Sequence, residues 1–351
     1  MGMVARKASP AGATGGKAAG GDALQDPLTK SAIGAQAGGD LGPLYGDLLE
    51  RAANQAGATA ALFSLTGSAV ATAADDDGRN HYPEDDQKDP LPALREKHAA
   101  DGYERYDNNP VAVKGAGDKH AFDAHDVAQG ALGDCYLIAS MAAVARANPD
   151  AVSKLIKDNK NGTFDVTLYV RESTYAAPKK IVKTIDARLP SKELNKLLYA
   201  KGQDSENGKA ELWPSLIEKA VAQQTGSYEQ ISGGNIGKNL KFAGAMELLT
   251  GKQESYIPTS KLTPDDALLE IGVALESKKP VTVDSKDMEG DASMKAEAEK
   301  LNVYGNHAYA PEDVNLDKGT MDLQNPWGSD HVKGLKADLF IKYYRAIRIG
   351  G

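Results

Sequence analysis

The spacing of hydrophobic residues changes along the chain from a helical period to a strand-like alternation. Helical spacing predicts helices over residues 135–147, 150–156 and 212–224. Runs rich in β-branched and aromatic residues predict strands over residues 164–170, 180–185, 281–284, 307–310 and 320–323. Because the helices gather around the single cysteine and most strands come later, we expect an α+β fold of two packed lobes rather than a βαβ repeat. A substrate cleft is expected between the lobes.

The first 90 residues show little of this periodicity. Residues 1–40 are dominated by glycine, alanine, serine and lysine and contain few large apolar groups, which predicts a disordered arm. Within residues 41–90, Leu44 and Leu48 recur at helical spacing and predict one short helix, which an acidic linker follows. The linker lacks the alternating ligand spacing of an EF-hand loop. We therefore expect the folded core to occupy residues 91–351.

Composition and charge limit the kinds of molecule that the protein is expected to bind and the place in the cell where it is expected. The chain of 351 residues carries a formal net charge of -8, which leaves no overall basic surface to neutralise phosphates, so no nucleic acid partner is expected. The most apolar early stretch, residues 60–74, is shorter than the roughly 18 to 20 residues needed to cross a bilayer, so no membrane partner is expected. The basic N-terminus has no apolar run behind it. We expect a cytoplasmic protein, or one secreted without a conventional signal peptide.

Cys135 is the single cysteine of the chain, so an intramolecular disulfide cannot form. A lone cysteine is commonly a small buried apolar residue, but glycines precede Cys135 and a helical apolar pattern follows it. At a helix N-terminus the unpaired N–H groups and the helix dipole favour an anion, so we expect a lowered thiol pKa and a nucleophile. Gln129, upstream in the same segment, offers an amide donor for an oxyanion, although loop glutamines are also common in turns.

Short segments that carry this chemistry follow one another in a fixed order. They are QGALGDCYLIA at residues 129–139, ELWPSLIEKA at 211–220 with GSYEQISGG at 226–234, GNHAY at 305–309 and LQNPWG at 323–328. Together they resemble the protease core of the calpains, which are cysteine proteases of the papain-like fold. The resemblance implies an α+β, two-lobed core, with the cysteine on a helical lobe and the histidine and asparagine on a β-rich lobe.

The resemblance also implies a Cys-His-Asn triad. Cys135 is expected to be the nucleophile and His307 its base, while Asn325 accepts from the second ring nitrogen and fixes the imidazole plane. Gln129 is expected to stabilise the oxyanion together with the Cys135 N–H, and Trp327 to shield the histidine–asparagine hydrogen bond from water. Each segment has a structural alternative, because a histidine beside aromatic residues is commonly a core residue and Asn-Pro is a common turn.

Calcium is the one ion that the resemblance implies. Asp126 and Glu229 match two acidic calcium ligands of the family, but two carboxylates supply too few of the roughly 6 to 8 oxygens that calcium prefers. No cofactor is expected for the chemistry itself. Tyr136 stands where the family usually has tryptophan, and the chain ends soon after Gly328, so the C2-like and penta-EF-hand domains of animal calpains are not expected.

These observations favour a cysteine endopeptidase that cleaves peptide bonds in protein or peptide substrates. A non-proteolytic acyl transferase of the transglutaminase type would use the same constellation, and a catalytically silent binding module would keep the same fold. The glycine- and alanine-rich arm and the missing regulatory domains are compatible with a bacterial effector or toxin, for which an inhibitor or immunity protein would be a partner. Calcium regulation is the further expectation for such a core.

Overall fold

The fold is described from a computed structural model, in which the described residues are 103–351 apart from 174, 194–195 and 235–243. The predicted arm, short helix and acidic linker of residues 1–90 lie outside the described residues. All described residues belong to one compact unit, Arg51–Gly351. None of the helices within them combines the length with the apolar character that crossing a bilayer requires.

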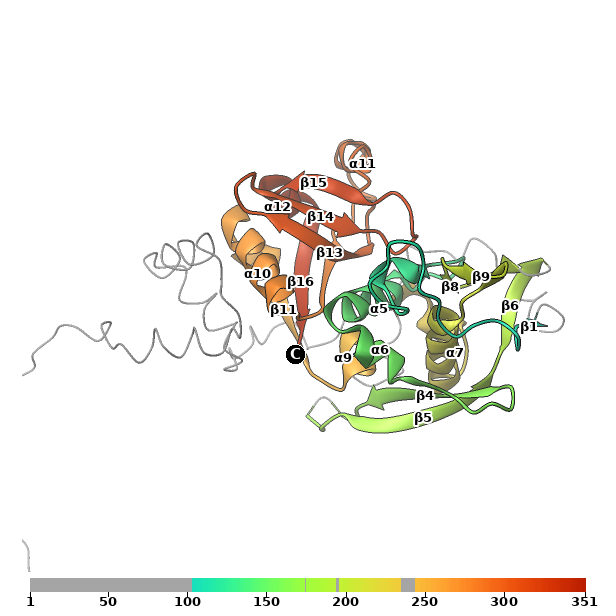
Figure 1. The fold of residues 1–351 in the computed structure, drawn as a ribbon. Coiled ribbons are helices and arrows are strands. Elements are labelled where there is room, and N and C mark those ends of the chain that lie inside the picture. The colour runs from blue at the N-terminus through green and yellow to red at the C-terminus, as the bar shows by residue number, and fades with distance from the viewer. Residues whose placement is uncertain (1–102, 174, 194–195, 235–243) are drawn as a thin grey trace, which may run out of the picture. The chain divides into compact units, whose positions relative to one another are not determined.

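The first half of the described chain forms a helical lobe. Its helices are α5 (Cys135–Ala147), α6 (Pro149–Ser153), α7 (Trp213–Thr225) and α9 (Ala245–Thr250). An antiparallel sheet in the order β3-β4-β5 packs against α7 and α9 and consists of β3 (Ile156–Asp158), β4 (Thr163–Val170) and β5 (Lys179–Asp186) (Figure 1). The remaining short elements are β1 (Tyr103–Arg105), η1 (Ala124–Asp126), β2 (Val127–Ala128), β6 (Arg188–Glu193), β7 (Lys196–Leu197), β8 (Lys201–Gly202), β9 (Ser205–Glu206), β10 (Lys209–Ala210) and η2 (Glu229–Gly234).

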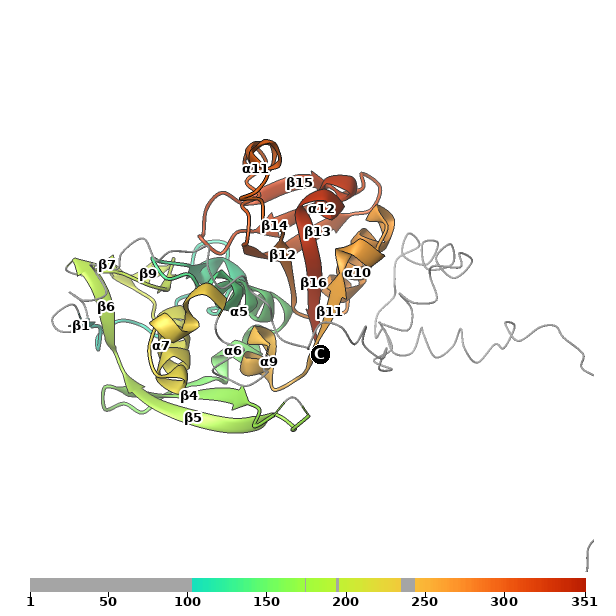
Figure 2. The ribbon, with the colours of Figure 1, turned by 180° about the vertical axis from the view of Figure 1, so that it is seen from behind.

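The second half forms a β-rich lobe around a six-stranded antiparallel sheet in the order β11-β16-β12-β13-β14-β15. The strands are β11 (Glu254–Pro258), β12 (Val281–Ser285), β13 (Ala308–Asn315), β14 (Thr320–Gln324), β15 (Val332–Lys336) and β16 (Tyr344–Gly350). The helical elements of this lobe are η3 (Thr259–Lys261), α10 (Pro264–Glu276), α11 (Ala292–Glu299) and α12 (Ala337–Tyr343). Helices α10 and α12 pack together against the sheet, as the view from behind shows (Figure 2).

Local sequence explains where several of these elements start and stop. Helix α10 begins after Thr263, whose hydroxyl accepts from the N–H of Asp266 while the Asp266 carboxylate accepts in return, which is a capping box. Helix α7 ends at Gly226, which adopts a φ of 113° that favours glycine. The helix predicted over residues 150–156 is shorter than expected. It ends at Ser153 because Ile156 pairs with β4, and this strand pairing overrides the local helical spacing.

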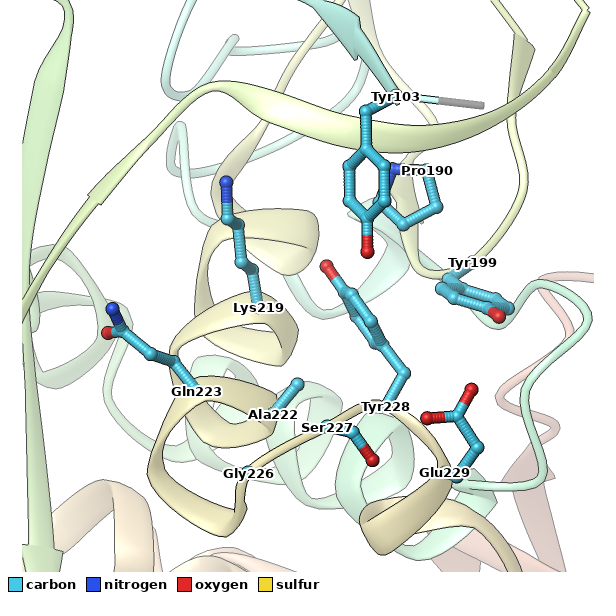
Figure 3. A pocket seen from close by; sticks show the side chains of 10 residues that line it. All are labelled: Tyr103, Pro190, Tyr199, Lys219, Ala222, Gln223, Gly226, Ser227, Tyr228 and Glu229. Atoms are coloured by element: carbon cyan, nitrogen blue, oxygen red, sulfur yellow. The ribbon is translucent and has the colours of Figure 1, made fainter. Parts of the chain in front are cut away.

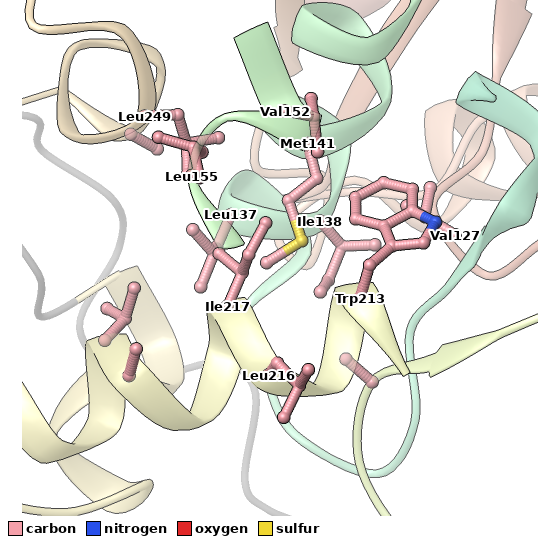
Figure 4. Packing of buried hydrophobic residues seen from close by; sticks show 14 of the residues in the cluster. Val127, Leu137, Ile138, Met141, Val152, Leu155, Trp213, Leu216, Ile217 and Leu249 are labelled. Carbon is pink, nitrogen blue, oxygen red and sulfur yellow. The ribbon is translucent and has the colours of Figure 1, made fainter. Parts of the chain in front are cut away.

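Each lobe has its own buried hydrophobic cluster. In the helical lobe, α5 and α7 face each other with apolar side chains (Figure 4). The facing residues are Leu137, Ile138 and Met141 from α5 and Trp213, Leu216 and Ile217 from α7. All of them are completely buried, so packing against α7 helps to hold α5 in place, together with its contacts to α9.

Helix α5 also contacts the other lobe, where it packs against β12 and β13. Arg146 near its C-terminus donates to the Gln324 side chain at 2.6 Å, and Gln324 donates to the main-chain oxygen of Ala124 at 2.7 Å. These buried polar contacts join the two lobes on either side of α5. The α+β prediction is confirmed, with helices around Cys135 and strands around His307 and Asn325.

Candidate active site

Cys135 is the first residue of α5, as predicted, and the loop before it is held by main-chain hydrogen bonds. The N–H of Gln129 donates to the Pro326 oxygen at 2.7 Å, and the N–H of Ala131 donates to the Leu198 oxygen at 2.9 Å. Gly130 has no room for a side chain, because a Cβ there would lie 2.3 Å from the Leu198 oxygen. The glycine therefore lets the nucleophile segment pass close to the neighbouring backbone.

His307 and Asn325 meet at the edge of the β-rich lobe. The His307 Nε2 and the Asn325 Oδ1 lie 2.9 Å apart, and both side chains are buried. Ser285 on β12 binds the backbone of His307 twice, because its hydroxyl accepts from the His307 N–H at 2.9 Å and donates to the His307 oxygen at 3.0 Å. The Nδ1 of His331 accepts from the Asn325 N–H at 3.1 Å. The backbones of His307 and Asn325 are thus each held by the side chain of another residue.

Aromatic rings enclose the imidazole. The Trp327 ring lies 4.8 Å from the His307 ring, and the Tyr309 ring meets it edge-on at 4.9 Å. Tyr304 lies 4.5 Å from Trp327 and extends the enclosure. The main-chain N–H of Trp327 donates to the Asn325 Oδ1 at 3.1 Å. Trp327, which covers His307, therefore also contacts the asparagine that binds His307. Trp327 remains partly exposed on its outer face.

Cys135 lies next to the histidine strand, but its thiol is protonated in this arrangement. Burial raises the pKa of the Cys135 thiol to about 12, although the Ala308 N–H donates to it and favours the thiolate. Burial also lowers the pKa of His307 to about 4. The Nδ1 of His307 is buried and makes no hydrogen bond within the described residues. The lowered thiol pKa expected from the helix position is wrong for this arrangement, because removal of the thiolate from water outweighs the helix N-terminus.

Gln129 is buried beside the nucleophile segment. Its Nε2 donates to the Leu132 oxygen at 2.6 Å, which leaves one of the two amide N–H groups for another acceptor. Its Oε1 is buried and has no partner among the described residues. The amide thus has one N–H beyond its bond to Leu132 and an unpartnered oxygen within the described residues, and its role at an oxyanion stays a prediction.

Asp126 is the centre of a group of carboxylates. Ligand oxygens of Asp118, Asp126 and Asp204 lie within 4.8 Å of one another. Burial raises the pKa of Asp126 to about 7, while hydrogen bonds from the Asp123 N–H and the Trp213 side chain oppose that rise. Burial and the nearby Asp126 charge raise the pKa of Glu211 to about 9. Asp126 and Glu211 therefore lose their protons less readily than ordinary carboxyl groups, and a cation bound there would favour that loss.

Glu229, the second predicted calcium ligand, is not among the carboxylates gathered around Asp126. It lines a different cavity of about 350 Å³ together with Tyr103, Tyr199 and Tyr228 (Figure 3). The predicted catalytic residues do not line this cavity. The structure does not gather Asp126 and Glu229 into one group of carboxylates, and calcium binding by these two residues stays a prediction.

Several residues that hold the site carry no signal in the sequence. Ser285, His331 and Ala308 act through backbone contacts that only the folded sheet brings together. Asp118 and Asp204 reach Asp126 from segments on either side of it in the sequence. A search of the sequence for a calcium-loop spacing cannot find such a group, because its members come from separate segments.

A buried cysteine at a helix N-terminus, beside a histidine that is bound to an asparagine, is the arrangement of papain-type cysteine hydrolases. The chain belongs to the calpain family of cysteine proteases, because the profile of the calpain family cysteine proteases matches residues 117–342, more than half of its length. The predicted family is therefore confirmed.

Curated calpains show the same likeness at modest identity. Calpain clp-4 of Caenorhabditis elegans is 28% identical over 214 residues, which cover 58% of this chain and 27% of that protein. The calpain-2 catalytic subunit of Gallus gallus is 28% identical over 210 residues, covering 58% and 28%. A calpain of Schistosoma mansoni is 29% identical over 254 residues, covering 69% and 30%. The matched region spans less than a third of the length of these relatives.

Proposed function

We propose that this chain is a cysteine endopeptidase that hydrolyses protein substrates through Cys135, His307 and Asn325. The observation that carries the proposal is the buried 2.9 Å contact between the His307 Nε2 and the Asn325 Oδ1, next to a cysteine at a helix N-terminus. This contact leaves the Nδ1 of the same ring as the nitrogen available for the thiol. Membership of the calpain family supports the same reaction.

In the proposed reaction, the Cys135 proton moves to the Nδ1 of His307, and the thiolate forms a bond to the carbonyl carbon of a peptide. The Cys135 N–H and the Gln129 amide stabilise the oxyanion. The imidazolium then protonates the departing amine as the C–N bond breaks, which leaves a thioester on Cys135. Water hydrolyses the thioester and frees the carboxylate, with His307 as the base.

The Cys135 thiol and the His307 imidazole are both neutral in this arrangement, because burial raises the thiol pKa to about 12 and lowers the imidazole pKa to about 4. An ion pair between them requires either direct contact or more water around both groups. We infer that a small opening between the lobes, or entry of a substrate, precedes proton transfer. This step would act on the contacts that join the loop of Gln129 to the segment of Pro326.

Calcium regulation is part of the proposal, but no reaction step depends on it. The carboxylates of Asp118, Asp126 and Asp204 offer oxygen ligands of the kind that calcium prefers. Glu229 instead lines the separate cavity that contains the tyrosines. Titration of the Cys135→Ala protein with calcium in a calorimeter tests binding without self-cleavage. Heat of binding that disappears in Asp126→Asn but remains in Glu229→Gln would assign calcium to the carboxylate group around Asp126.

Casein hydrolysis tests the proposed activity. The wild-type chain, Cys135→Ala and His307→Ala are compared, each with calcium and with a chelator. His120→Ala is the matched control, because this histidine is exposed. Hydrolysis by the wild type and the control, but by neither active-site variant, is the expected result. Hydrolysis that persists in Cys135→Ala refutes the mechanism, and transfer of an amine without hydrolysis would indicate an acyl transferase.

A further inference from the structure

Two buried carboxyl groups lie close together next to Cys135, the proposed nucleophile. Asp134 is the residue before Cys135 and is fully buried, while Glu218 on α7 is 2% exposed. Each side chain lies within hydrogen-bonding reach of the other, although neither Asp134 oxygen has a donor when both groups are ionised. Two carboxylates cannot donate, so the contact requires one proton between the two groups.

The surroundings of this pair also require that proton. Both Glu218 oxygens accept from the Ala200 N–H, at 3.1 and 3.2 Å. With both acids ionised, the buried Asp134 oxygens would have no donor from another residue of the described chain. A proton on Glu218 supplies that donor. The pair is therefore a carboxylic acid bonded to a carboxylate.

The titratable groups that face the pair are acids. Cys135 on α5 interacts electrostatically with Asp134, and Tyr228, in the loop after α7, interacts with both members. Within the described chain, no lysine, arginine or histidine contributes to the electrostatic environment of Asp134 or Glu218. Burial raises the pKa of both carboxyl groups, and the Asp134 charge raises that of Glu218 further. No cation of the described chain therefore compensates a second negative charge at this place.

Asp134 also sets the start of the helix that carries Cys135. Its main-chain oxygen accepts from the N–H of Leu137 at 2.8 Å and from that of Ile138 at 3.2 Å. Its side chain does not cap α5 and points to Glu218 instead. The contact with Glu218 therefore ties the first turn of α5 to α7, the helix against which α5 packs.

We propose that Asp134 and Glu218 form a proton-sharing pair that positions Cys135, and that loss of the shared proton at alkaline pH makes Cys135 less reactive than it would be with the proton in place. The proposal rests on the proposed cysteine-protease function. When the proton leaves, two buried carboxylates repel each other and the first turn of α5 loses its tie to α7. The added negative charge beside Cys135 also disfavours the thiolate. Asp134 and Glu218 are positioning residues, since neither needs to touch the substrate.

The rate of Cys135 alkylation by iodoacetamide, measured from pH 5 to pH 10, tests the pair without a protease substrate. Glu218→Gln keeps a donor to Asp134 but has no proton to lose. It is expected to react at neutral pH within about twofold of the wild type, and to react faster than the wild type above the pH at which the shared proton is lost, where the wild-type rate should rise less steeply. Glu218→Leu removes the donor and is expected to react about tenfold more slowly at neutral pH. Glu276→Gln, an exposed glutamate on α10, is the matched control.

A second measurement separates this proposal from the proposed function. In the inactive Cys135→Ala background, the free energy of unfolding is measured against pH with and without the Glu218→Gln substitution. Because the folded state holds a proton that the unfolded chain has released, stability should fall as the pH rises above the ordinary glutamate pKa, and Glu218→Gln should remove that fall. The same pH dependence in both proteins, or superimposable alkylation profiles, would overturn the pair. Neither readout requires proteolysis, so absent casein hydrolysis would refute only the proposed function.

Discussion

Asn325→Ala removes the side chain that accepts from the proposed base. The Asn325 Oδ1 lies 2.9 Å from the His307 Nε2 at a position that is completely buried. A hydrogen bond to a charged group contributes about 1.5 to 3 kcal/mol, and here the imidazole is charged only after it accepts the Cys135 proton. The loss therefore falls on the transition state, and we expect a decrease of roughly 10- to 150-fold in kcat.

The assay is hydrolysis of a fluorogenic peptide that the wild-type chain cleaves, with kcat and KM determined separately. KM should change little, because Asn325 is completely buried and cannot touch a substrate. Asn161→Ala is the matched control, since that asparagine is exposed and its side chain accepts from Thr163 in a turn before β4. Thermal unfolding of both variants checks that each remains folded.

Two results would refute the reasoning. A kcat within about twofold of the wild type, together with an inactive His307→Ala, would mean that the imidazole needs no partner at its Nε2. A large increase in KM at unchanged kcat would mean that Asn325 shapes the substrate site rather than the base. A loss of folded protein in Asn325→Ala but not in Asn161→Ala would limit the role of the residue to stability.

Further predictions concern the loop, the lobe contact and the enclosure of the histidine. Gly130→Ala should lower stability by about 1 to 3 kcal/mol in urea unfolding, because the new Cβ would meet main-chain oxygens at 2.3 Å. Burial opposes ionisation of Glu312, but hydrogen bonds from His125 and Lys333 lower its pKa to about 2. Stability should therefore fall as the pH drops from about 4.5 towards 2, and Glu312→Gln should flatten this part of the curve. Trp327→Ala should raise the His307 pKa above about 4 in an NMR titration, because the ring would gain water; an unchanged pKa would refute the shielding role.

The sequence pattern predicted several central strands of the two sheets. It missed the strand formed by the last residues of the chain. The run at residues 164–170 became β4 and that at 281–284 became β12, because both alternate or concentrate β-branched residues over a usual strand length. Strand β16 (Tyr344–Gly350) was missed, although it lies between β11 and β12 in the sheet. Its arginines interrupt the apolar run, and one of them, Arg348, is buried where Asp284 pairs with it at 2.9 Å and Glu254 at 3.3 Å.

The family segments predicted where Cys135, His307 and Asn325 lie in the fold, since those segments contain the proposed catalytic side chains themselves. They could not predict Ser285 or His331, which act on the same residues from other strands and loops. Ser285 and His331 bind the backbones of His307 and Asn325, and such contacts depend on how neighbouring strands and loops are aligned. A motif or a hydrophobic period does not specify that alignment.

The charge state of Cys135 was the prediction that failed, and its failure shows which interactions local sequence leaves out. The position of the thiol at a helix N-terminus follows from the residues around it, and this position alone favours the thiolate. Burial by the β-rich lobe follows only from the packing of α5 against β12 and β13, and the acids Asp134 and Asp284 add to it. Because burial is the larger effect, the pKa of the thiol is raised rather than lowered. The proposed protease would therefore depend on the contact between its lobes as much as on its triad.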